Sequence, residues 1–240
     1  MNQPLTDRVI VLAGGSGGLG SAVARALSAE GSRLIVSYRE NAERAQSLSD
    51  IATLVRADLS RAEDRKRLLD AAPGLYALVV FSGNPARVTS PNQMDEAMRL
   101  SNEVNCLGPL LLAREAASRM QAAKAPGAIV LFSTMQAVSL FPGSTAYATA
   151  KAALIHGAQI LAKEVRGPSN IRVNVIAPGV TQAGMAEASI AAGKYQRYLD
   201  EGVISRYGRS EDIARAVRFF LEPDNFITGQ VLAVDGGLTL

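Results

Sequence analysis

Seven short apolar runs, separated by longer segments with helical spacing, constrain the fold of this chain more than any other feature. The runs are rich in Val, Ile and Leu, and most do not alternate with polar residues, which is typical of strands buried on both faces. They span residues 8–13, 33–38, 52–58, 76–82, 128–133, 171–177 and 230–235. The helical segments span 18–30, 41–49, 61–71, 94–122, 145–166 and 210–221. This order predicts an α/β fold, with a doubly wound parallel sheet of about seven strands and helices on both faces.

The length of 240 residues fits one large domain, and 48% hydrophobic residues supply a sizeable core. No linker, repeat or low-complexity tract divides the chain, so we expect a single domain over residues 1–240. Residues 180–205 form the longest connection, between the sixth apolar run and the helix that begins near Ser210. Such a connection is often a substrate loop or lid; the alternative is an ordinary helical excursion on the surface.

Charge and cysteine content exclude several classes of protein. The net charge is only +3 and no run of five basic residues occurs, which argues against a nucleic-acid partner. A single cysteine, Cys106, cannot form an internal disulfide and fits a reducing compartment. No apolar stretch predicts a signal peptide or a membrane span, so we expect a cytoplasmic protein. His156 is the only histidine and has no cluster of ligands beside it, so we predict no metal site.

A glycine-rich loop, "AGGSGGLGSAVARAL" at 13–27, follows the first apolar run and opens a helix. Gly15, Gly17 and Gly20 match the dinucleotide pattern G-x-G-x-x-G, and Gly14, Gly18 and Gly20 match G-x-x-x-G-x-G. Glycines let the backbone turn sharply and approach a pyrophosphate, and the helix start offers amide groups and a positive dipole end. The loop therefore predicts a dinucleotide site.

The end of the second apolar run should lie near the adenosine ribose. A site that prefers NAD normally has an acidic residue there. This chain has Arg39, whose planar fork suits a 2′-phosphate, although Glu40 follows it and argues the other way. We therefore expect NADP(H) rather than NAD(H). Asp58, after the third run, can accept from the adenine amino group or serve as a turn or cap residue.

One helix start carries a local signal. Ser60 followed by Glu63 matches a capping box, in which each side chain satisfies an orphan amide at the first turn. The pattern predicts that Ser60 caps the helix expected over 61–71.

Tyr147 and Lys151 stand four residues apart in "STAYATAK", so they are neighbours on one face of a helix. An unperturbed phenol has a pKa near 10 and is a poor base at neutral pH. A neighbouring ammonium favours the phenolate, so we expect Lys151 to lower the pKa of Tyr147. With such a pKa the phenol can exchange a proton with a carbonyl oxygen.

Several motifs together resemble those of the short-chain dehydrogenases/reductases, and most closely the subgroup of β-ketoacyl carrier-protein reductases. The resemblance covers residue 8 to the C-terminus. Its pieces are the glycine loop 14–20, "ADLS" at 57–60, "NCLG" at 105–108, "YATAK" at 147–151, "NVIAPG" at 174–179 and "ITGQVLAVDGG" at 227–237. It implies a Rossmann-type sheet and hydride transfer with a nicotinamide.

The resemblance also implies roles for individual residues. Tyr147 is the proton donor or acceptor, and Lys151 binds the ribose and lowers the pKa of the phenol. Asn105 matches the residue that holds a water between the lysine and solvent; the alternative is a polar residue at a helix kink. Pro178 and Gly179 match the turn beside the nicotinamide. The implied catalytic set is Asn105, Thr134, Tyr147 and Lys151. The implied cofactor-binding set is Gly14, Ser16, Gly17, Gly18, Leu19, Gly20, Arg39, Asp58, Leu59, Gly83, Tyr147, Lys151, Pro178, Gly179 and Thr181.

The chain departs from the family pattern at three places. Thr134 stands where the family has its catalytic serine; it can donate the same hydrogen bond with a stiffer side chain, while Ser133 should face away. Ala13 replaces a threonine before the glycine loop, which removes a hydroxyl. The family's "NNAG" is "VFSG" at 80–83, which keeps Gly83. None of these changes removes a proton-transfer group.

The leading hypothesis is an NADPH-dependent carbonyl reductase, acting on a small-molecule ketone or on a 3-oxoacyl thioester carried by an acyl carrier protein. The alternatives are an NAD-dependent alcohol dehydrogenase of the same fold and a non-catalytic module that senses NADP(H). The basic residues Lys124, Arg166 and Arg172 are candidates to meet an acidic carrier, or else are solvated surface charges. The resemblance implies a homotetramer or homodimer. Residues 84–93 and 180–205 are expected to shape the substrate pocket.

Overall fold

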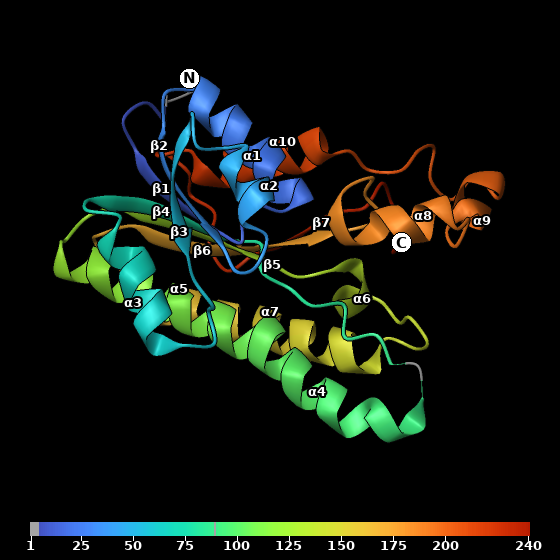
Figure 1. Ribbon diagram of the computed structural model, residues 1–240. Helices are drawn as coiled ribbons and strands as arrows, with labels where there is room; N and C mark the ends of the chain where they lie inside the picture. Colours follow the sequence, from blue (N-terminus) through green and yellow to red (C-terminus); the bar gives the residue numbers. More distant parts are fainter. Residues whose placement is uncertain (1–4, 89) are drawn as a thin grey trace.

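The computed structural model describes residues 5–88 and 90–240 of the chain. In these residues seven parallel strands form one sheet in the order β3-β2-β1-β4-β5-β6-β7 (Figure 1). The strands are β1 (Val9–Ala13), β2 (Arg33–Tyr38), β3 (Ala52–Arg56), β4 (Leu75–Val80), β5 (Gly127–Phe132), β6 (Ile171–Pro178) and β7 (Val231–Val234). The strand order reverses between β1 and β4, and ligands bind parallel α/β sheets at such switch points. The predicted doubly wound sheet is confirmed.

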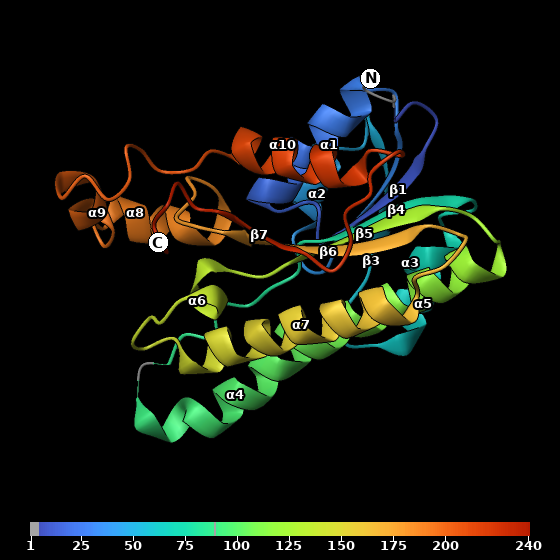
Figure 2. The ribbon, with the colours of Figure 1, turned by 180° about the vertical axis from the view of Figure 1, so that it is seen from behind.

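Helices cover both faces of the sheet, as Figures 1 and 2 show from opposite sides. One face carries α1 (Gly18–Ala29), α2 (Ala42–Gln46) and α10 (Ser210–Leu221). The other carries α3 (Ala62–Asp70), α4 (Met94–Asn102), α5 (Gly108–Ala122) and α7 (Thr145–Glu164). The short elements η1 (Pro91–Gln93), α6 (Met135–Val138), η3 (Gly184–Ala186), α8 (Glu187–Ala191) and α9 (Gln196–Asp200) lie in connections. None of the helices in the described part of the chain could span a membrane.

The core consists of two layers, one on each face of the sheet. In β4, Leu78 and Val80 pack into the layer under α5 and α7, whereas Ala77 and Val79 pack into the layer under α1 and α10. Successive side chains of a strand point to opposite faces, so a strand covered on both sides is apolar at every position. All six residues of β4 are buried. This double burial explains why the apolar runs lack alternation.

One expected helical segment contains an irregular turn, and one expected helix cap is wrong. The segment 94–122 is interrupted by a π-helical turn, η2 (Glu103–Leu107), between α4 and α5. The expected capping box does not form, because α3 begins at Ala62 and the hydroxyl of Ser60 donates to Asp58 Oδ1 at 2.8 Å.

The basic residues expected to meet a carrier protein lie at the wrong edge of the sheet. Lys124 precedes β5 and Arg166 precedes β6, so both lie at the amino ends of the strands, while the glycine loop follows the carboxyl end of β1. Arg172 is only 3% exposed and donates to the carbonyl oxygen of Phe220 at 3.0 Å and to the Tyr76 hydroxyl at 3.3 Å. That guanidinium supports the C-terminal end of α10, so this carrier-binding prediction is wrong.

Candidate active site

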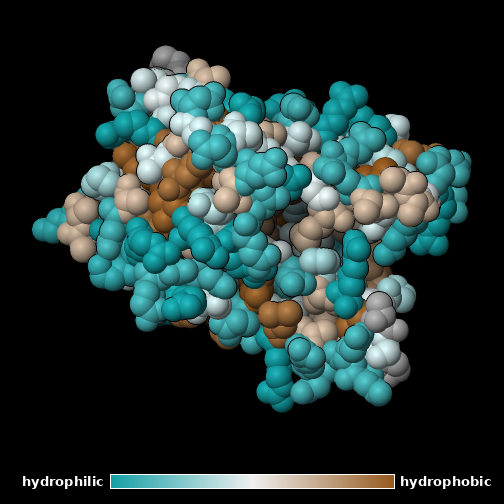
Figure 3. All heavy atoms as spheres, viewed as in Figure 1, coloured by the Kyte–Doolittle hydropathy of each residue, from teal (hydrophilic) through white to brown (hydrophobic). Residues whose placement is uncertain are grey.

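A cavity of about 1170 Å³ lies at the carboxyl ends of the strands. The face shown in Figure 3 is mostly hydrophilic and is hollowed near its centre. The cavity brings together every residue that the sequence assigned to the cofactor, from Gly14 to Thr181, and also Thr134. Asn105 does not line the cavity and is fully buried behind it.

The glycine loop is held in shape by backbone contacts that side chains would block. Gly14 has φ +72°, and its N–H donates to the Ser37 hydroxyl at 2.9 Å. A Cβ on Gly20 would lie 2.5 Å from the Cα of Gly15, so the first turn of α1 packs directly against the loop. Ser37 thus supplies a hydroxyl at the glycine loop, where Ala13 lacks the one expected from threonine. The open N-terminus of α1 can receive a pyrophosphate.

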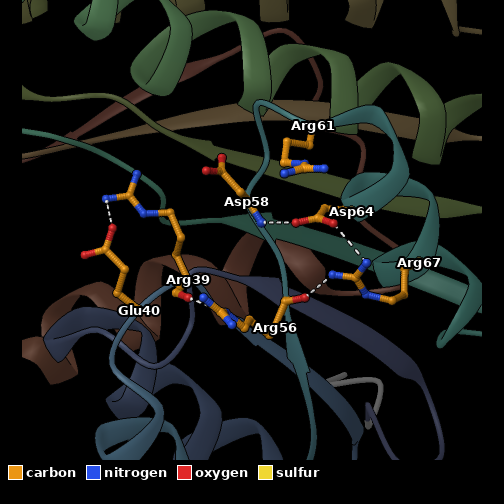
Figure 4. Close-up of a pocket in the computed structure, with 7 residues that line it drawn as sticks. All are labelled: Arg39, Glu40, Arg56, Asp58, Arg61, Asp64 and Arg67. Atoms are coloured by element: carbon orange, nitrogen blue, oxygen red, sulfur yellow. Dashed lines mark hydrogen bonds and ion pairs between the residues drawn. The ribbon is translucent and has the colours of Figure 1, made fainter.

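The adenosine end of the cavity opens into a second cavity of about 450 Å³ (Figure 4). Arg39, Glu40 and Asp58 line both cavities. Arg39 forms an ion pair with Glu40 at 2.9 Å, and both side chains are exposed. The Asp58 carboxylate accepts from the backbone N–H of Ser60 at 3.0 Å, as a turn residue does, and its side chain still borders the cavity. Arg39 and Asp58 therefore both border the cavity at this end, and Glu40 is the ion-pair partner of Arg39.

A chain of interactions behind this end joins the two strand ends that carry Arg39 and Asp58 (Figure 4). Asp64 Oδ2 accepts the backbone N–H of Asp58 at 2.8 Å, and Arg67 pairs with Asp64 at 2.9 Å. Arg67 also donates to the carbonyl oxygen of Arg56, whose Nε donates to the carbonyl oxygen of Arg39 at 3.2 Å. The hydrogen bond from Asp58, helped by Arg67, lowers the pKa of the Asp64 carboxyl. No sequence motif indicates this chain of interactions, because most of its links join side chains to backbone groups.

Lys151 is held at the centre of the site by carbonyl oxygens. Its Nζ donates to the carbonyl oxygen of Phe132 at 2.7 Å and to that of Ser82 at 3.1 Å. The side chain is buried, and burial lowers the pKa of the ammonium to about 7. At neutral pH Lys151 is therefore divided between its charged and neutral forms.

The pKa of Tyr147 differs from the expectation. Burial raises it to about 12, and only a hydrogen bond with Thr134 acts in the opposite direction. The predicted lowering of the Tyr147 pKa by Lys151 is wrong, because the lysine Nζ hydrogen-bonds to the carbonyl oxygens of Ser82 and Phe132 instead. Thr134 is the N-cap of α6, and its hydroxyl accepts the N–H of Gln136 at 3.3 Å. Thr134 thus lies beside the phenol, and Ser133 turns away and donates to the Lys151 carbonyl at 3.1 Å.

Asn105 forms hydrogen bonds with the backbone of the loop that follows β4. Its Oδ1 accepts the N–H of Asn84 at 2.8 Å, and its Nδ2 donates to the carbonyl of Asn84 at 2.9 Å and to the Ser101 hydroxyl at 2.9 Å. A Cβ on Gly83 would lie 3.2 Å from Asn105 Oδ1 and 3.7 Å from Lys151 Nζ. The π-helical turn therefore places Asn105 against the loop whose Ser82 carbonyl binds Lys151, and Asn84 takes part through its backbone.

Comparison with known proteins agrees with this geometry. Residues 13–239 match the family described as enoyl-(acyl carrier protein) reductase. The chain is 30% identical to the 3-oxoacyl-(acyl-carrier-protein) reductase FabG of Rickettsia felis, over 98% of both chains. It is also 30% identical to NADPH-dependent aldehyde reductase 2, chloroplastic, of Arabidopsis thaliana, over 98% of this chain and 95% of that protein. The chain belongs to the short-chain dehydrogenase/reductase family. It is therefore an NAD(P)(H)-binding oxidoreductase that acts on carbonyl or hydroxyl groups.

Solved structures of other short-chain dehydrogenases/reductases share the fold. A short-chain type dehydrogenase/reductase from Mycobacterium ulcerans has a TM-score of 0.89 and 27% identity, covering 98% of this chain and 90% of that one. A 7α-hydroxysteroid dehydrogenase, complexed with NADH and 7-oxo glycochenodeoxycholic acid, has a TM-score of 0.88 and 28% identity. The match covers 98% of this chain and 96% of that one. The residues present in this chain fit a dinucleotide: a loop free of long side chains meets a helix start, and Arg39, Lys151 and Thr181 border the same cavity.

This short-chain dehydrogenase/reductase has site residues that the sequence did not reveal. Phe81, at a position where the family pattern has asparagine, packs on Phe132 with ring centroids 4.5 Å apart, and both border the cavity. Segment 180–205 reaches back over the site: a Cβ on Gly18 would lie 2.7 Å from the N of Gly184, and Met185 Cε comes within 3.6 Å of a Cβ on Gly83. In residues 5–88 and 90–240 no cluster of three or more side chains suits a metal ion.

Proposed function

We propose that this enzyme is an NADPH-dependent carbonyl reductase in which Tyr147 donates the proton to the carbonyl oxygen. The observation that carries the proposal is the placement of Tyr147 and Thr134 together on one cavity wall, with Lys151 bordering the same cavity. Burial raises the pKa of Tyr147 to about 12, so the phenol is protonated at neutral pH. A protonated phenol is the form that a reduction requires.

Each polar group in the site has a distinct task. Thr134 donates its hydroxyl hydrogen to the substrate oxygen and stabilises the charge that develops there, while its backbone is fixed as the cap of α6. Lys151 replaces the proton lost by Tyr147, which suits a group whose pKa is about 7. Asn105 holds the loop that carries the Ser82 carbonyl and so keeps Lys151 in place. The reduced nicotinamide, when bound, supplies the hydride.

We assign NADP(H) as the preferred cofactor, because Arg39 is the cation at the adenosine end that both cavities share. A 2′-phosphate would replace Glu40 as the partner of Arg39. Substitution Arg39→Ala should raise the KM for NADPH far more than that for NADH. Equal increases would refute the assignment of the 2′-phosphate to Arg39.

The substrate pocket is proposed to lie between the loop after β4 and segment 180–205, which we assign as a lid. Support comes from the small apolar cluster that joins Met135, Val180 and Ile204, against which Phe141 and Tyr198 pack. A 3-oxoacyl thioester is one substrate that fits the similarity to the Rickettsia felis protein. The direct test mixes the purified protein and NADPH with ketones, aldehydes, quinones and 3-oxoacyl thioesters and follows NADPH consumption; no turnover of any of them would refute the proposal.

An NAD-dependent alcohol dehydrogenase is the second candidate, and the Arg39–Glu40 ion pair is the observation that favours it, since Glu40 could accept from the ribose hydroxyls. Initial rates of alcohol oxidation with NAD and of ketone reduction with NADPH separate the two. A higher kcat/KM with NAD and the alcohol would favour the second candidate.

We also propose that the enzyme is cytoplasmic and forms a homodimer or homotetramer. Leu107, Leu111 and Ile160 are large apolar side chains that lie exposed on the helices of one face. Light scattering on the purified protein should give two or four chains per particle, and a monomer at micromolar concentration would contradict the assembly.

A further inference from the structure

We propose that the carbonyl substrate bears an oxyanion, carboxylate or phosphate, which Arg87, Lys194 and Arg197 bind at the lid end of the cavity. This inference rests on the proposed reductase function and specifies the substrate class of the same site. It starts from the distribution of charge along the cavity wall.

The carboxylates that line the cavity are confined to one end, where Arg39 and Arg44 accompany them, whereas the other end carries only cations. The two carboxylates, Glu40 and Asp58, lie at the adenosine end, after β2 and β3. At the other end, the loop after β4 contributes Arg87 and the lid contributes Lys194 and Arg197, with no carboxylate on that part of the wall among the described residues. A cleft lined by one sign of charge concentrates ligands of the opposite sign.

The two lid cations are held over aromatic rings. Lys194 Nζ lies 5.5 Å from the centroid of the Tyr195 ring, and the Arg197 guanidinium carbon lies 4.8 Å from that of Tyr198. Arg197 also donates to the Tyr198 hydroxyl at 3.1 Å. The two rings stack with centroids 6.5 Å apart and are half-buried beside the apolar cluster of the lid. The cations therefore sit on a fixed aromatic platform that borders the cavity.

The acids of the lid are largely engaged elsewhere. Glu187 accepts the N–H of Gly184 at 2.7 Å, and Asp200 accepts from Gln196 at 2.9 Å. Glu201 contributes least among the groups that raise the pKa of Arg197, and it acts through charge alone, without a hydrogen bond. In the described part of the chain no ion pair within 4.0 Å includes Arg87, Lys194 or Arg197. Their charge is thus available to a ligand.

The apolar wall between these cations and Tyr147 sets the shape of the substrate. Met135, Phe141, Pro142 and Met185 line the cavity beside the lid tyrosines. A substrate that fits has a ketone at one end, an apolar middle and an anionic group at the other end. A keto acid and the phosphate arm of a pantetheine thioester share this chemistry.

The test compares matched anionic and neutral substrates. One pair is a medium-chain keto acid and its methyl ester; the other is a 3-oxoacyl thioester of phosphopantetheine and the same acyl group on N-acetylcysteamine. We expect the anionic member of at least one pair to have the higher kcat/KM, and the pair that responds identifies the source of the anion. Higher kcat/KM for both neutral members would overturn the proposal.

The variants are Lys194→Gln and Arg197→Gln, singly and together, with Lys124→Gln at the far edge of the sheet as the control. Both side chains are exposed and solvent screens their charge, so each single change should lower kcat/KM for the anionic substrate by about two- to fivefold and leave the neutral one unchanged. Equal loss with both substrates, or none with either, contradicts the proposal.

Calorimetry separates this inference from the reductase assignment. The anionic alcohol product is titrated into the parent and into the double variant, each with NADP⁺ present. If NADPH reduces no ketone but the alcohol still binds the parent more tightly than the double variant, the reductase assignment fails and the anion site stands. Equal affinities for parent and variant refute the anion site, whatever the turnover shows.

Discussion

The ammonium of Lys151 donates to the carbonyl oxygen of Phe132 at 2.7 Å and to that of Ser82 at 3.1 Å, so the segments at the ends of β4 and β5 hold this side chain. Burial lowers the pKa of Lys151 to about 7 and raises that of Tyr147 to about 12. The two groups therefore differ from the simple expectation of a phenolate beside an ammonium. The phenol therefore stays protonated at neutral pH, and the lysine is the group that titrates near neutral pH.

The depressed pKa of Lys151 predicts how the stability depends on pH. The unfolded chain keeps its proton up to a pKa near 10.4, while the folded protein loses it above about pH 7. Between these values the unfolded state binds more protons, so the free energy of unfolding rises with pH. Relative to Lys151→Met, the cofactor-free parent should therefore gain stability from pH 7 to pH 10. Urea unfolding of both proteins checks this; a constant difference would refute the lowered pKa.

The raised pKa of Tyr147 can be measured directly. Absorbance titration of the parent and of Tyr147→Phe, both without cofactor, should give a difference spectrum of tyrosinate only above about pH 11, because burial keeps the phenol protonated. A difference that develops below pH 10 would show that Lys151 already lowers the pKa of the phenol.

The close contact of Gly18 with Gly184 predicts a selective effect on folding. In Gly18→Ala the added Cβ would lie 2.7 Å from the backbone N of Gly184, so either the lid or α1 must shift. We expect a loss of about 1–3 kcal/mol in the free energy of unfolding, as for other overpacked sites. Gly17→Ala is the matched control, because its nearest atom, Gly14 O, is 3.5 Å away. Equal unfolding midpoints in urea for the two variants would show that the lid does not press on Gly18.

The interactions among Asp64, Arg67 and Arg56 should tune cofactor binding from outside the cofactor cavity. Arg67→Gln removes the donor that fixes the Arg56 carbonyl, so Arg39 is less well placed. Because Arg67 is half exposed, we expect only about a two- to fivefold increase in the KM for NADPH with little change in kcat. Lys66→Gln, which breaks another ion pair of α3, should change neither. A fall in kcat alone would assign Arg67 a role other than positioning.

The hydroxyl of Thr134 should be required and its methyl group should not. Thr134→Ser keeps a donor beside Tyr147 and should stay within a few-fold of the parent kcat, whereas Thr134→Val should lose about 10²–10³ in kcat. The rate of NADPH consumption measures both. Similar rates for the valine and serine variants would exclude a role for the hydroxyl in stabilising the oxyanion.

The sequence predicted most of the fold because the central strands β1, β4, β5 and β6 are buried on both faces and helical segments separate most of the strands. The bounds of β2 and α10 match the expected 33–38 and 210–221. The residues that the motifs assign to the cofactor all line one cavity, since their positions along the chain put them near the carboxyl ends of the strands. The motifs correctly placed Thr134 beside Tyr147.

What the sequence could not predict depends on contacts between distant segments. Ser37 supplies a hydroxyl to Gly14 from another strand, and Asn105 in the π-helical turn at 103–107 bonds the backbone of Asn84. Ser60 is an exception, because a local hydrogen bond to Asp58 replaces the expected cap of α3. The burial of Lys151 reversed the expected pKa shift of Tyr147, and no local pattern reports burial.

The most direct test of the account is a single-turnover experiment with Tyr147→Phe and the best ketone substrate. The variant must first be shown to bind NADPH with the affinity of the parent, by fluorescence titration of the nucleotide. Loss of a general acid lowers such rates by about 10²–10⁴-fold, and we predict a loss in that range with unchanged NADPH binding. If the variant oxidises NADPH in the presence of the ketone as fast as the parent, Tyr147 is not the proton donor and the account is wrong.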